Sequence, residues 1–315
     1  MPITEHLDHL RNVPSEVSTA PESGGKTVID TKTVIDSKGV LSGDGKTLLY
    51  LGDSDRERWS SFASATGDFA WRGSDITIGA LTLGLDYRLT DHVVIGTALT
   101  YAHASVGLDA GGSAELNSAL GSLYATVFEG GFYLDAILGF GYHHYDTERA
   151  TTSGFAHGET AGGSIHGLIG GGYDWWLGPF TIGPIASLRY SDVATDRFTE
   201  HDTLTPIRVT SGSLDSLQST IGFKLAYSWA LGRIIITPEL RVQWAHEFLD
   251  TKDVINTREP FTPLNRGLGS DSLLLDAGAW MQLSPRVAVF GYYRADIGRS
   301  DYSSHSINGG VQISF

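Results

Sequence analysis

Apolar and polar residues alternate along most of this chain, from Trp59 to Phe315, and this period of two restricts its fold more than any other feature. One stretch shows the pattern clearly, because every second residue is apolar and the residues between them are polar or small. Its apolar set is Leu81, Leu83, Leu85, Tyr87 and Leu89. Side chains of a strand point alternately to opposite faces, whereas a helix repeats every 3.6 residues, so the pattern predicts strands.

The predicted strands are unusually long. We count about twelve, each of roughly 9 to 15 residues, whereas strands of globular proteins average about 5–6 residues and those of membrane barrels about 9–11. Their ranges are 58–67, 76–89, 93–106, 114–128, 132–145, 160–176, 180–190, 217–229, 233–247, 271–283, 286–297 and 304–315. The lengths favour a membrane barrel over a soluble sandwich.

The links between these strands alternate between short and long. The short links are 89–92, 129–131, 177–179, 230–232 and 284–285, and the long links include 146–159, 192–216 and 249–270. Short turns at one end and long polar loops at the other are typical of outer-membrane barrels. The sequence therefore predicts an all-β fold, a twelve-stranded antiparallel transmembrane β-barrel preceded by a short N-terminal polar segment.

Tryptophans gather near the short links, where an aromatic belt at one membrane interface is expected. The predicted interface residues are Trp59, Trp175, Trp176, Trp229 and Trp280. The alternative is that these tryptophans fill a soluble core, and the pattern of links argues against it.

Charged residues occupy the polar face of the predicted strands, which would line a hydrated lumen. These are Asp86, Arg88, Asp135, Arg189, Lys224, Glu239, Arg241, Asp276, Arg294 and Asp296. Opposite signs are mixed among them, so neighbouring strands could pair them. We expect them to brace and hydrate the barrel rather than to select a transported solute.

Residues 1–57 differ in character from the rest and define a separate segment, with the barrel at 58–315. The opening TEHLDHLRNV predicts a short helix before Pro14, with Thr4 as its cap. The segment expected to fill the pore is 45–58, and an extended chain of about nine or ten residues suffices to cross about 30 Å of hydrocarbon. We therefore interpret residues 1–57 as a linker, a pore-threading segment or the remnant of an exported domain.

Composition excludes several classes of protein. The chain has no cysteine, so it cannot be a disulfide scaffold or hold a cysteine-ligated metal. A net charge of −14 argues against a nucleic-acid partner. No apolar run approaches the length of a membrane-spanning helix, and residues 1–20 show no signal peptide. We therefore expect that Met1 is a misplaced start or that the chain is a fragment.

No group of residues makes a convincing catalytic, cofactor or metal site. Gly52-Asp53-Ser54 resembles the nucleophile block of GDS-type esterases, but the companion blocks are missing. His143 and His144 are adjacent on a predicted strand and so face opposite sides, which prevents a shared metal ion; His246-Glu247 is no stronger. We expect no enzymatic activity, no cofactor and no metal.

The stretch from Trp59 to Phe315 resembles the autotransporter β-domain, the translocator of type V secretion. The resemblance is carried by the order and spacing of RWSSFASATGDF, ITIGALTLGLDYRLTDHVVIGTALTYAHA, SALGSLYATVFEGGFYLDAILGFGYHHYDTERA, SLQSTIGFKLAYSW and IITPELRVQWAHEF. It implies a barrel in a Gram-negative outer membrane that exports an N-terminal passenger through its lumen. The Asn-Asn pair of self-cleaving members is missing.

The resemblance also implies partners and an assembly signal. The final strand INGGVQISF looks like the signal that the barrel-assembly machinery reads, carried by Ile307, Gly309, Val311, Ile313 and Phe315. The expected partners are that machinery, outer-membrane lipids with lipopolysaccharide, and the protein's own passenger, and we expect a monomer. The alternative function is a stand-alone outer-membrane channel or surface adhesin whose long loops face outward.

Overall fold

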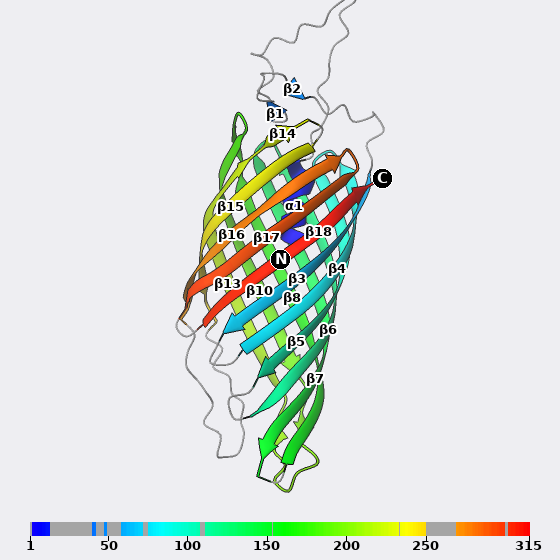
Figure 1. Ribbon diagram of the computed structural model, residues 1–315, viewed down its shortest axis with the longest axis vertical. Coiled ribbons are helices and arrows are strands. Elements are labelled where there is room, and N and C mark those ends of the chain that lie inside the picture. Colours follow the sequence, from blue (N-terminus) through cyan, green and yellow to red (C-terminus); the bar gives the residue numbers. More distant parts are fainter. Residues whose placement is uncertain are drawn as a thin grey trace, which may run out of the picture.

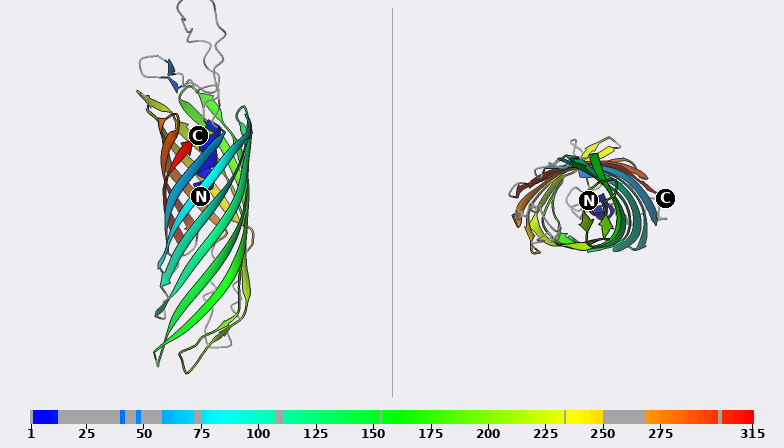
Figure 2. Two further views of the ribbon diagram at one scale, coloured as in Figure 1. Left: turned by 90° about the vertical axis from the view of Figure 1, so that its right-hand side faces the viewer. Right: turned by 90° about the horizontal axis from the view of Figure 1, so that it is seen from below.

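The computed structural model shows a closed β-barrel with one helix inside it (Figures 1 and 2). It describes residues 2–12, 40–41, 47–48, 58–71, 75–107, 111–152, 154–232, 234–249, 269–299 and 302–315. The barrel strands are β3 (Trp59–Trp71), β4 (Asp75–Thr90), β5 (Val93–Gly107), β6 (Gly112–Glu129), β7 (Phe132–Thr151), β8 (Gly154–Tyr173), β10 (Phe180–Thr195), β13 (Gly212–Tyr227), β15 (Ile234–Glu247), β16 (Asp271–Ser284), β17 (Val287–Arg299) and β18 (Tyr302–Ser314). The shorter elements are α1 (Pro2–Asn12), β1 (Val40–Leu41), β2 (Thr47–Leu48), β9 (Trp175–Leu177), β11 (Phe198–Thr199), β12 (Arg208–Val209) and β14 (Trp229–Leu231).

Each barrel strand pairs antiparallel with its neighbour in sequence, and the last strand closes the ring on the first. β18 pairs with β3 from Ser303 opposite Trp71 to Ser314 opposite Ser60. Closure gives the backbone groups of both end strands a partner, which an apolar solvent requires. The prediction of a twelve-stranded antiparallel barrel is therefore confirmed.

The alternation seen in the sequence becomes an outer apolar face and an inner polar face. On β4, Leu81 and Leu83 are 51% and 55% exposed, whereas Thr82 and Asp86 are buried. The exposed leucines lie on the outside of the barrel, where hydrocarbon takes the place of water.

Short turns join the strands at the end of the barrel that carries Phe315. Gly130, Gly178 and Gly232 stand in three of these turns with φ of 56°, 65° and 65°, a backbone region that glycine adopts without the penalty of a Cβ. The predicted short links are all found as such turns, between the ends of successive strands.

The opposite end differs from the prediction in two places. The expected long loop 146–159 is instead an extension of β7 and β8, which pair to the end of the hairpin at Thr151 opposite Gly154. The expected loop 192–216 is shorter, because β10 and β13 pair as far as Thr195 opposite Gly212. Polar residues on both faces of these extensions conceal the alternation, because both faces are in water. Most of the third loop, 249–270, falls outside the described residues.

Helix α1 lies within the ring of strands, as the view along the barrel shows (Figure 2). The predicted short helix is therefore present, but it begins at Pro2, so Thr4 is inside the helix and is not its cap. Proline suits a first helical position because its φ is already helical and it lacks the N–H that would be left unpaired. The segment expected in the pore, 45–58, falls largely outside the described residues. No helix in the described part of the chain is long and apolar enough to span a membrane.

Candidate functional site

The candidate functional site is the lumen, where α1 packs against the inner wall. The apolar side of α1 consists of Ile3, Leu7 and Leu10, which the helical repeat brings onto one face. Leu7 is completely buried. These side chains form one cluster with wall residues from β3, β5 and β6; the wall members are Phe62, Val94, Ala98 and Tyr124. One side of the helix is thus held by apolar packing.

A buried hydrogen-bond network centred on Asp86 joins α1 to β3, β4 and β6. The Nε2 of His6 lies 2.5 Å from Oδ2 of Asp86, and both residues are almost fully buried. Ser60 donates to the same carboxylate at 3.0 Å, and the Tyr124 hydroxyl donates to its other oxygen. A buried carboxylate with three partners meets the requirement that a charge removed from water be compensated.

On the opposite side of α1, Asp8 is the centre of a second network. Its carboxylate pairs with Arg11 one helical turn away and with Arg241 on β15, and it lies 3.6 Å from the Nζ of Lys224 on β13. Lys224 also donates to Asp174 at 3.0 Å. One helical carboxylate thus bridges two strands that lie far from the apolar cluster around the ring.

Arg11 and Glu5 extend the charged contact to β7 and β17. Arg11 donates to Asp135 at 2.5 Å, and its guanidinium lies 3.8 Å from the ring centre of Tyr133. Glu5 lies 3.9 Å from Arg294, which also pairs with Asp276. Contacts on both sides of the helix fix its rotation as well as its position.

The contacts also fix the direction of α1. Near its C-terminus, the carbonyl of Leu10 accepts a hydrogen bond from Arg88 at 3.1 Å, two residues before the end of β4 at the short-turn side. The N-terminus of α1 therefore points along the lumen toward the long-loop end, as Figure 1 shows.

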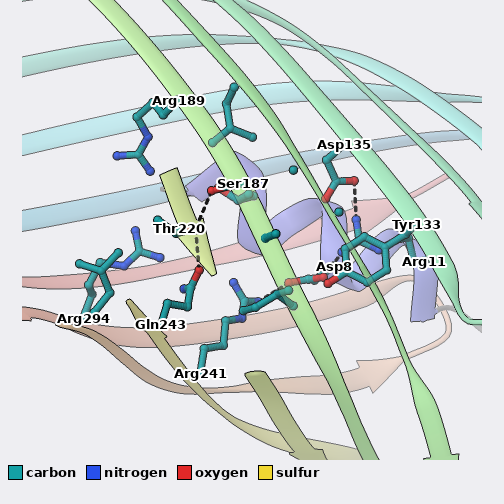
Figure 3. Close-up of a pocket in the computed structure, with 17 residues that line it drawn as sticks. Asp8, Arg11, Tyr133, Asp135, Ser187, Arg189, Thr220, Arg241, Gln243 and Arg294 are labelled. Carbon is teal, nitrogen blue, oxygen red and sulfur yellow. Dashed lines mark hydrogen bonds and ion pairs between the residues drawn. The ribbon is translucent and has the colours of Figure 1, made fainter. Parts of the chain in front are cut away.

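A cavity remains beside α1 within the lumen (Figure 3). Thr4, Asp8 and Arg11 form its helical side, and β8, β10, β13 and β15 provide much of its wall. Ser187, Thr220 and Gln243 form a hydrogen-bonded row along it, at 2.8 and 3.0 Å. Apolar side chains also line the cavity, among them Leu168, Ile185 and Leu274, so its lining is of mixed polarity.

The predicted lumen charges differ in their relation to α1. Direct hydrogen bonds or ion pairs to the helix come from Asp86, Arg88, Asp135, Lys224, Arg241 and Arg294. Glu239 and Asp276 bind the arginines of that set, Arg241 and Arg294 respectively. Arg189 lines the cavity, and Asp296 is half-buried on β17, two residues after Arg294.

The predicted interface tryptophans divide into two groups. Trp59, Trp175 and Trp229 are 44%, 50% and 54% exposed near the short turns, and Trp176 is half-buried beside them. Trp280 is different, because it is buried at 6% and packs with Phe290, at a ring distance of 4.6 Å. The prediction was wrong for Trp280, which shares the inner face of β16 with Asp276 and forms an internal aromatic cluster.

The C-terminal residues predicted as an assembly signal lie along β18. Ile307, Ile313 and Phe315 are exposed, and Gly309 and Val311 are half-buried between them. The backbone of Phe315 pairs with that of Trp59, so the terminal residue lies at the seam where the barrel closes. Their role as a signal stays a prediction.

The two adjacent histidines of β7 face opposite sides of the barrel wall. His143 is buried between Ser118 and Ser164 at 2.8 and 2.7 Å, whereas His144 is exposed and lies 3.5 Å from Asp146. No group of three histidine, cysteine, aspartate or glutamate side chains among the described residues could hold a metal ion. Gly52-Asp53-Ser54 falls outside the described residues.

At the long-loop end, the loop after β10 folds back onto the β7–β8 hairpin. Arg149 donates to both carboxylate oxygens of Glu200 at 2.9 and 2.6 Å, and the backbones of His157 and His201 exchange hydrogen bonds. The hydrogen bonds from Arg149 hold the pKa of the Glu200 carboxyl below its ordinary value, and Glu200 raises the pKa of Arg149. This ion pair holds the loop after β10 against the β7–β8 hairpin.

Sequence reasoning predicted charges on the barrel wall but did not predict their partners on the helix. In the sequence, His6, Asp8 and Arg11 belong to a polar N-terminal segment with no sign of a partner. The available signal was the spacing of Ile3, Leu7 and Leu10, which gives the short helix an apolar face that needs a partner surface.

Comparison with known proteins agrees with this architecture. The autotransporter beta-domain family matches residues 59–294. Among curated proteins, the chain is 24% identical to autotransporter CRAC of Citrobacter rodentium (strain ICC168) over 208 residues, 61% of this chain and 13% of the relative. It is 26% identical to the autotransporter adhesin/invasin TibA of Escherichia coli O78:H11 (strain H10407 / ETEC) over 235 residues, 71% and 22% of the two chains. The chain thus spans less than a quarter of these relatives.

Two solved structures share the fold. The translocator domain of autotransporter NalP from Neisseria meningitidis has a TM-score of 0.69 at 15% identity, covering 83% of this chain and 90% of that one. The beta domain of the Bordetella autotransporter BrkA has a TM-score of 0.66 at 20% identity, covering 82% and 100%.

Proposed function

This chain belongs to the autotransporter beta-domain family and is an outer-membrane translocator barrel, and on that basis we propose that it exports and anchors a passenger attached ahead of α1. The passenger would lie outside the cell and α1 would remain in the lumen. The long-loop end then faces outward and the short turns face the periplasm, as in other outer-membrane barrels.

The observation that carries this proposal is the direction of α1 in the lumen. Its N-terminus points to the long-loop end, whereas its C-terminus lies near the short turns, beside Arg88 and Asp135. A polypeptide attached ahead of Pro2 would therefore continue toward the outside. Apolar packing and buried ion pairs would retain the helix once export ends.

The same contacts disfavour the alternative of an open channel. α1 occupies the lumen with its apolar side against β3, β5 and β6 and its charged side against β7, β13, β15 and β17. A channel needs a continuous aqueous path, and here the helix occupies part of it.

Two partners follow from the outer surface of the barrel. Exposed apolar residues such as Leu81, Leu83 and Leu99 suit the acyl chains of outer-membrane lipids, including lipopolysaccharide. The exposed C-terminal face of Ile307, Ile313 and Phe315 suits recognition by the barrel-assembly machinery before insertion. Both partners are part of the proposal.

The test is an export assay in Gram-negative cells. A signal peptide and a small reporter domain are fused ahead of Met1 of the full chain, and surface exposure of the reporter is measured with external protease and antibody. We expect the reporter at the surface. The matched control replaces Phe315 and Ile313 with serine, which should reduce the amount of assembled barrel and of surface reporter together. An assembled barrel with the reporter retained in the periplasm would contradict the proposal.

A further inference from the structure

Three outward-facing histidines, here called the histidine belt, lie on the outside of the barrel toward the long-loop end. They are His103 on β5, His246 on β15 and His305 on β18. Each has an exposed aromatic neighbour: Tyr101 and Trp244 precede their histidines by two residues, and Tyr293 stacks on His305 across the β17–β18 pair at 5.9 Å. The exposed fractions of these aromatics are 57%, 51% and 43%. The belt is thus on the membrane side of the wall, not in the lumen.

The position of the belt along the strands matches the outer membrane interface. β5 begins at Val93 beside a short turn, and His103 is its eleventh residue. At about 3.4 Å per residue and a tilt of about 40°, ten steps rise about 26 Å, close to the height of about 25 Å of the apolar band of such barrels. His305 is likewise ten residues from Phe315, and His246 is the thirteenth residue of β15. The belt therefore lies at the level of the outer-leaflet headgroups.

Hydrogen bonds fix how two of these histidines present their rings. Nδ1 of His103 lies 3.0 Å from the side-chain oxygen of Asn117, and Nδ1 of His246 lies 2.9 Å from a carboxylate oxygen of Asp271. Both partners are acceptors, so each Nδ1 must carry the proton. Nε2 of each of these two rings then holds a lone pair. When such a ring gains a second proton, Nε2–H becomes a charged donor directed away from the Nδ1 partner.

We propose that the histidine belt binds the phosphate group of an outer-leaflet lipid headgroup. An imidazolium donor at headgroup depth is complementary to a phosphate anion, and the exposed aromatic beside it suits the boundary between acyl chains and headgroups. The carboxylate of Asp271 binds the His246 ring at Nδ1, which leaves Nε2 as the nitrogen for a second partner. The inference rests on the outer-membrane location but not on passenger export.

Acidic groups near the belt set the direction of its pH dependence. Asp271 faces His246, and Glu115 is exposed on β6 two residues from Asn117, on the side of His103. The negative charge of a carboxylate disfavours a phosphate beside it while the rings are neutral. Phosphate binding should therefore be stronger at a pH low enough to protonate the rings than at a pH at which they are neutral.

His144 provides a matched control on the same outer surface. It is also exposed and also follows an exposed tyrosine, Tyr142, by two residues. Its Nε2, however, lies 3.5 Å from a carboxylate oxygen of Asp146, so its outer nitrogen already faces an anion. A phosphate should gain little from this ring.

The experiment titrates the full chain, held in detergent micelles, with lipid A carrying two phosphates, with dephosphorylated lipid A of the same acyl chains, and with inorganic phosphate. Binding is measured by native mass spectrometry at pH 5.5 and pH 7.5. We expect the phosphorylated lipid to bind about tenfold or more tightly than the dephosphorylated one at pH 5.5, with a smaller difference at pH 7.5. The combined variant His103→Gln, His246→Gln and His305→Gln should lose that difference, and His144→Gln should keep it.

Three outcomes would overturn the proposal. The two lipids could bind equally, or the triple variant could still distinguish them. Inorganic phosphate could also compete for bound lipid A as effectively as unlabelled lipid A competes. Heat-modifiable gel mobility verifies that each variant is folded, and His246→Gln alone replaces the triple variant if the latter does not fold. The reporter export assay is run on the same variants. Export should be unchanged, so failure of the belt and failure of the translocator function give different results.

Discussion

Replacing Leu7 with alanine should loosen α1 from the lumen without altering the barrel wall. Leu7 is fully buried among Ile3, Leu10 and wall residues that include Phe62. Truncation of a buried leucine costs about 2–5 kcal/mol, from lost transfer free energy and the cavity left behind. At 1.4 kcal/mol per factor of ten, the equilibrium for release of the helix should rise about 30-fold to several thousand-fold.

A single introduced cysteine reports this release, because the chain has no cysteine of its own. Ala98 is 2% exposed and lies in the cluster under the helix, so Ala98→Cys should react with a water-soluble thiol reagent when α1 has moved away. When the helix opens and closes faster than the reagent reacts, the labelling rate follows the opening equilibrium. In the Ala98→Cys background, Leu7→Ala should therefore raise that rate at least about 30-fold.

The control replaces an apolar residue of similar size on the outer face. Leu83 is 55% exposed and points toward lipid, so Leu83→Ala should leave the labelling rate of the introduced thiol unchanged. A labelling rate that rises less than about threefold in the Leu7→Ala protein would refute the inference that apolar packing holds the helix in the lumen.

Three further predictions follow from particular contacts. Asp86→Ala removes the shared acceptor of His6, Ser60 and Tyr124. We therefore expect the free energy of unfolding, measured by urea titration, to fall by about 3–5 kcal/mol. An unchanged urea midpoint would contradict a stabilising role of the hydrogen bonds to Asp86. Gly84→Ala would place a Cβ 2.0 Å from Cε1 of Phe62 and should displace that ring from the apolar cluster under the helix, at a cost of about 1–3 kcal/mol. The labelling rate of Ala98→Cys should therefore rise. Gly79→Ala is the control, because its Cβ would meet no atom within 4 Å and the labelling rate should stay the same. Because Arg149 lowers the folded-state pKa of Glu200, the Arg149–Glu200 ion pair should hold loop 196–211 fully above the ordinary glutamate pKa of about 4.3 and be lost as the pH falls through the lower folded value. An acid-active protease should therefore cut the loop of the wild type more slowly than that of Glu200→Gln at about pH 5, and the two proteins should become alike at about pH 2.5. Equal rates in the two proteins at about pH 5 would contradict a role of the ion pair in holding the loop.

The barrel itself was predictable because one physical rule acts on nearly every residue of it. A strand in a wall with lipid outside and water inside needs apolar and polar side chains in alternation. Leu81, Thr82 and Leu83 show this alternation, because both leucines are exposed on the outside and Thr82 is buried. Where both faces are in water, as in the upper parts of β7 and β8, the rule no longer operates, and the strand extensions could not be read from the sequence. Trp280 is four residues after Asp276, so the alternation of side chains along a strand alone would have placed it on the same inner face. Its aromatic character instead suggested a membrane interface.

The lumen contents were harder to predict, because they depend on contacts between residues far apart in the chain. The wall charges could be recognised by their positions on strands, yet nothing local says that Asp8 pairs with Arg241 or that His6 meets Asp86. The short helix was expected from its composition. Its place inside the barrel follows only when its apolar and charged sides are matched to the two sides of the wall.

Cross-linking of α1 to the inner wall tests the central claim most directly. His6→Cys and Asp86→Cys, made together, place two thiols at positions whose side chains are in contact between the helix and the wall. Because the change also leaves Ser60 and Tyr124 without their acceptor, heat-modifiable gel mobility verifies that the variant barrel is folded. A short bifunctional thiol reagent added to outer membranes should join the two cysteines and shift the gel mobility of the denatured protein. The control pair, His6→Cys with Leu83→Cys on the outer face, should not react. Cross-linking of the outer pair and not of the inner one would show that α1 is not in the lumen and would contradict the account.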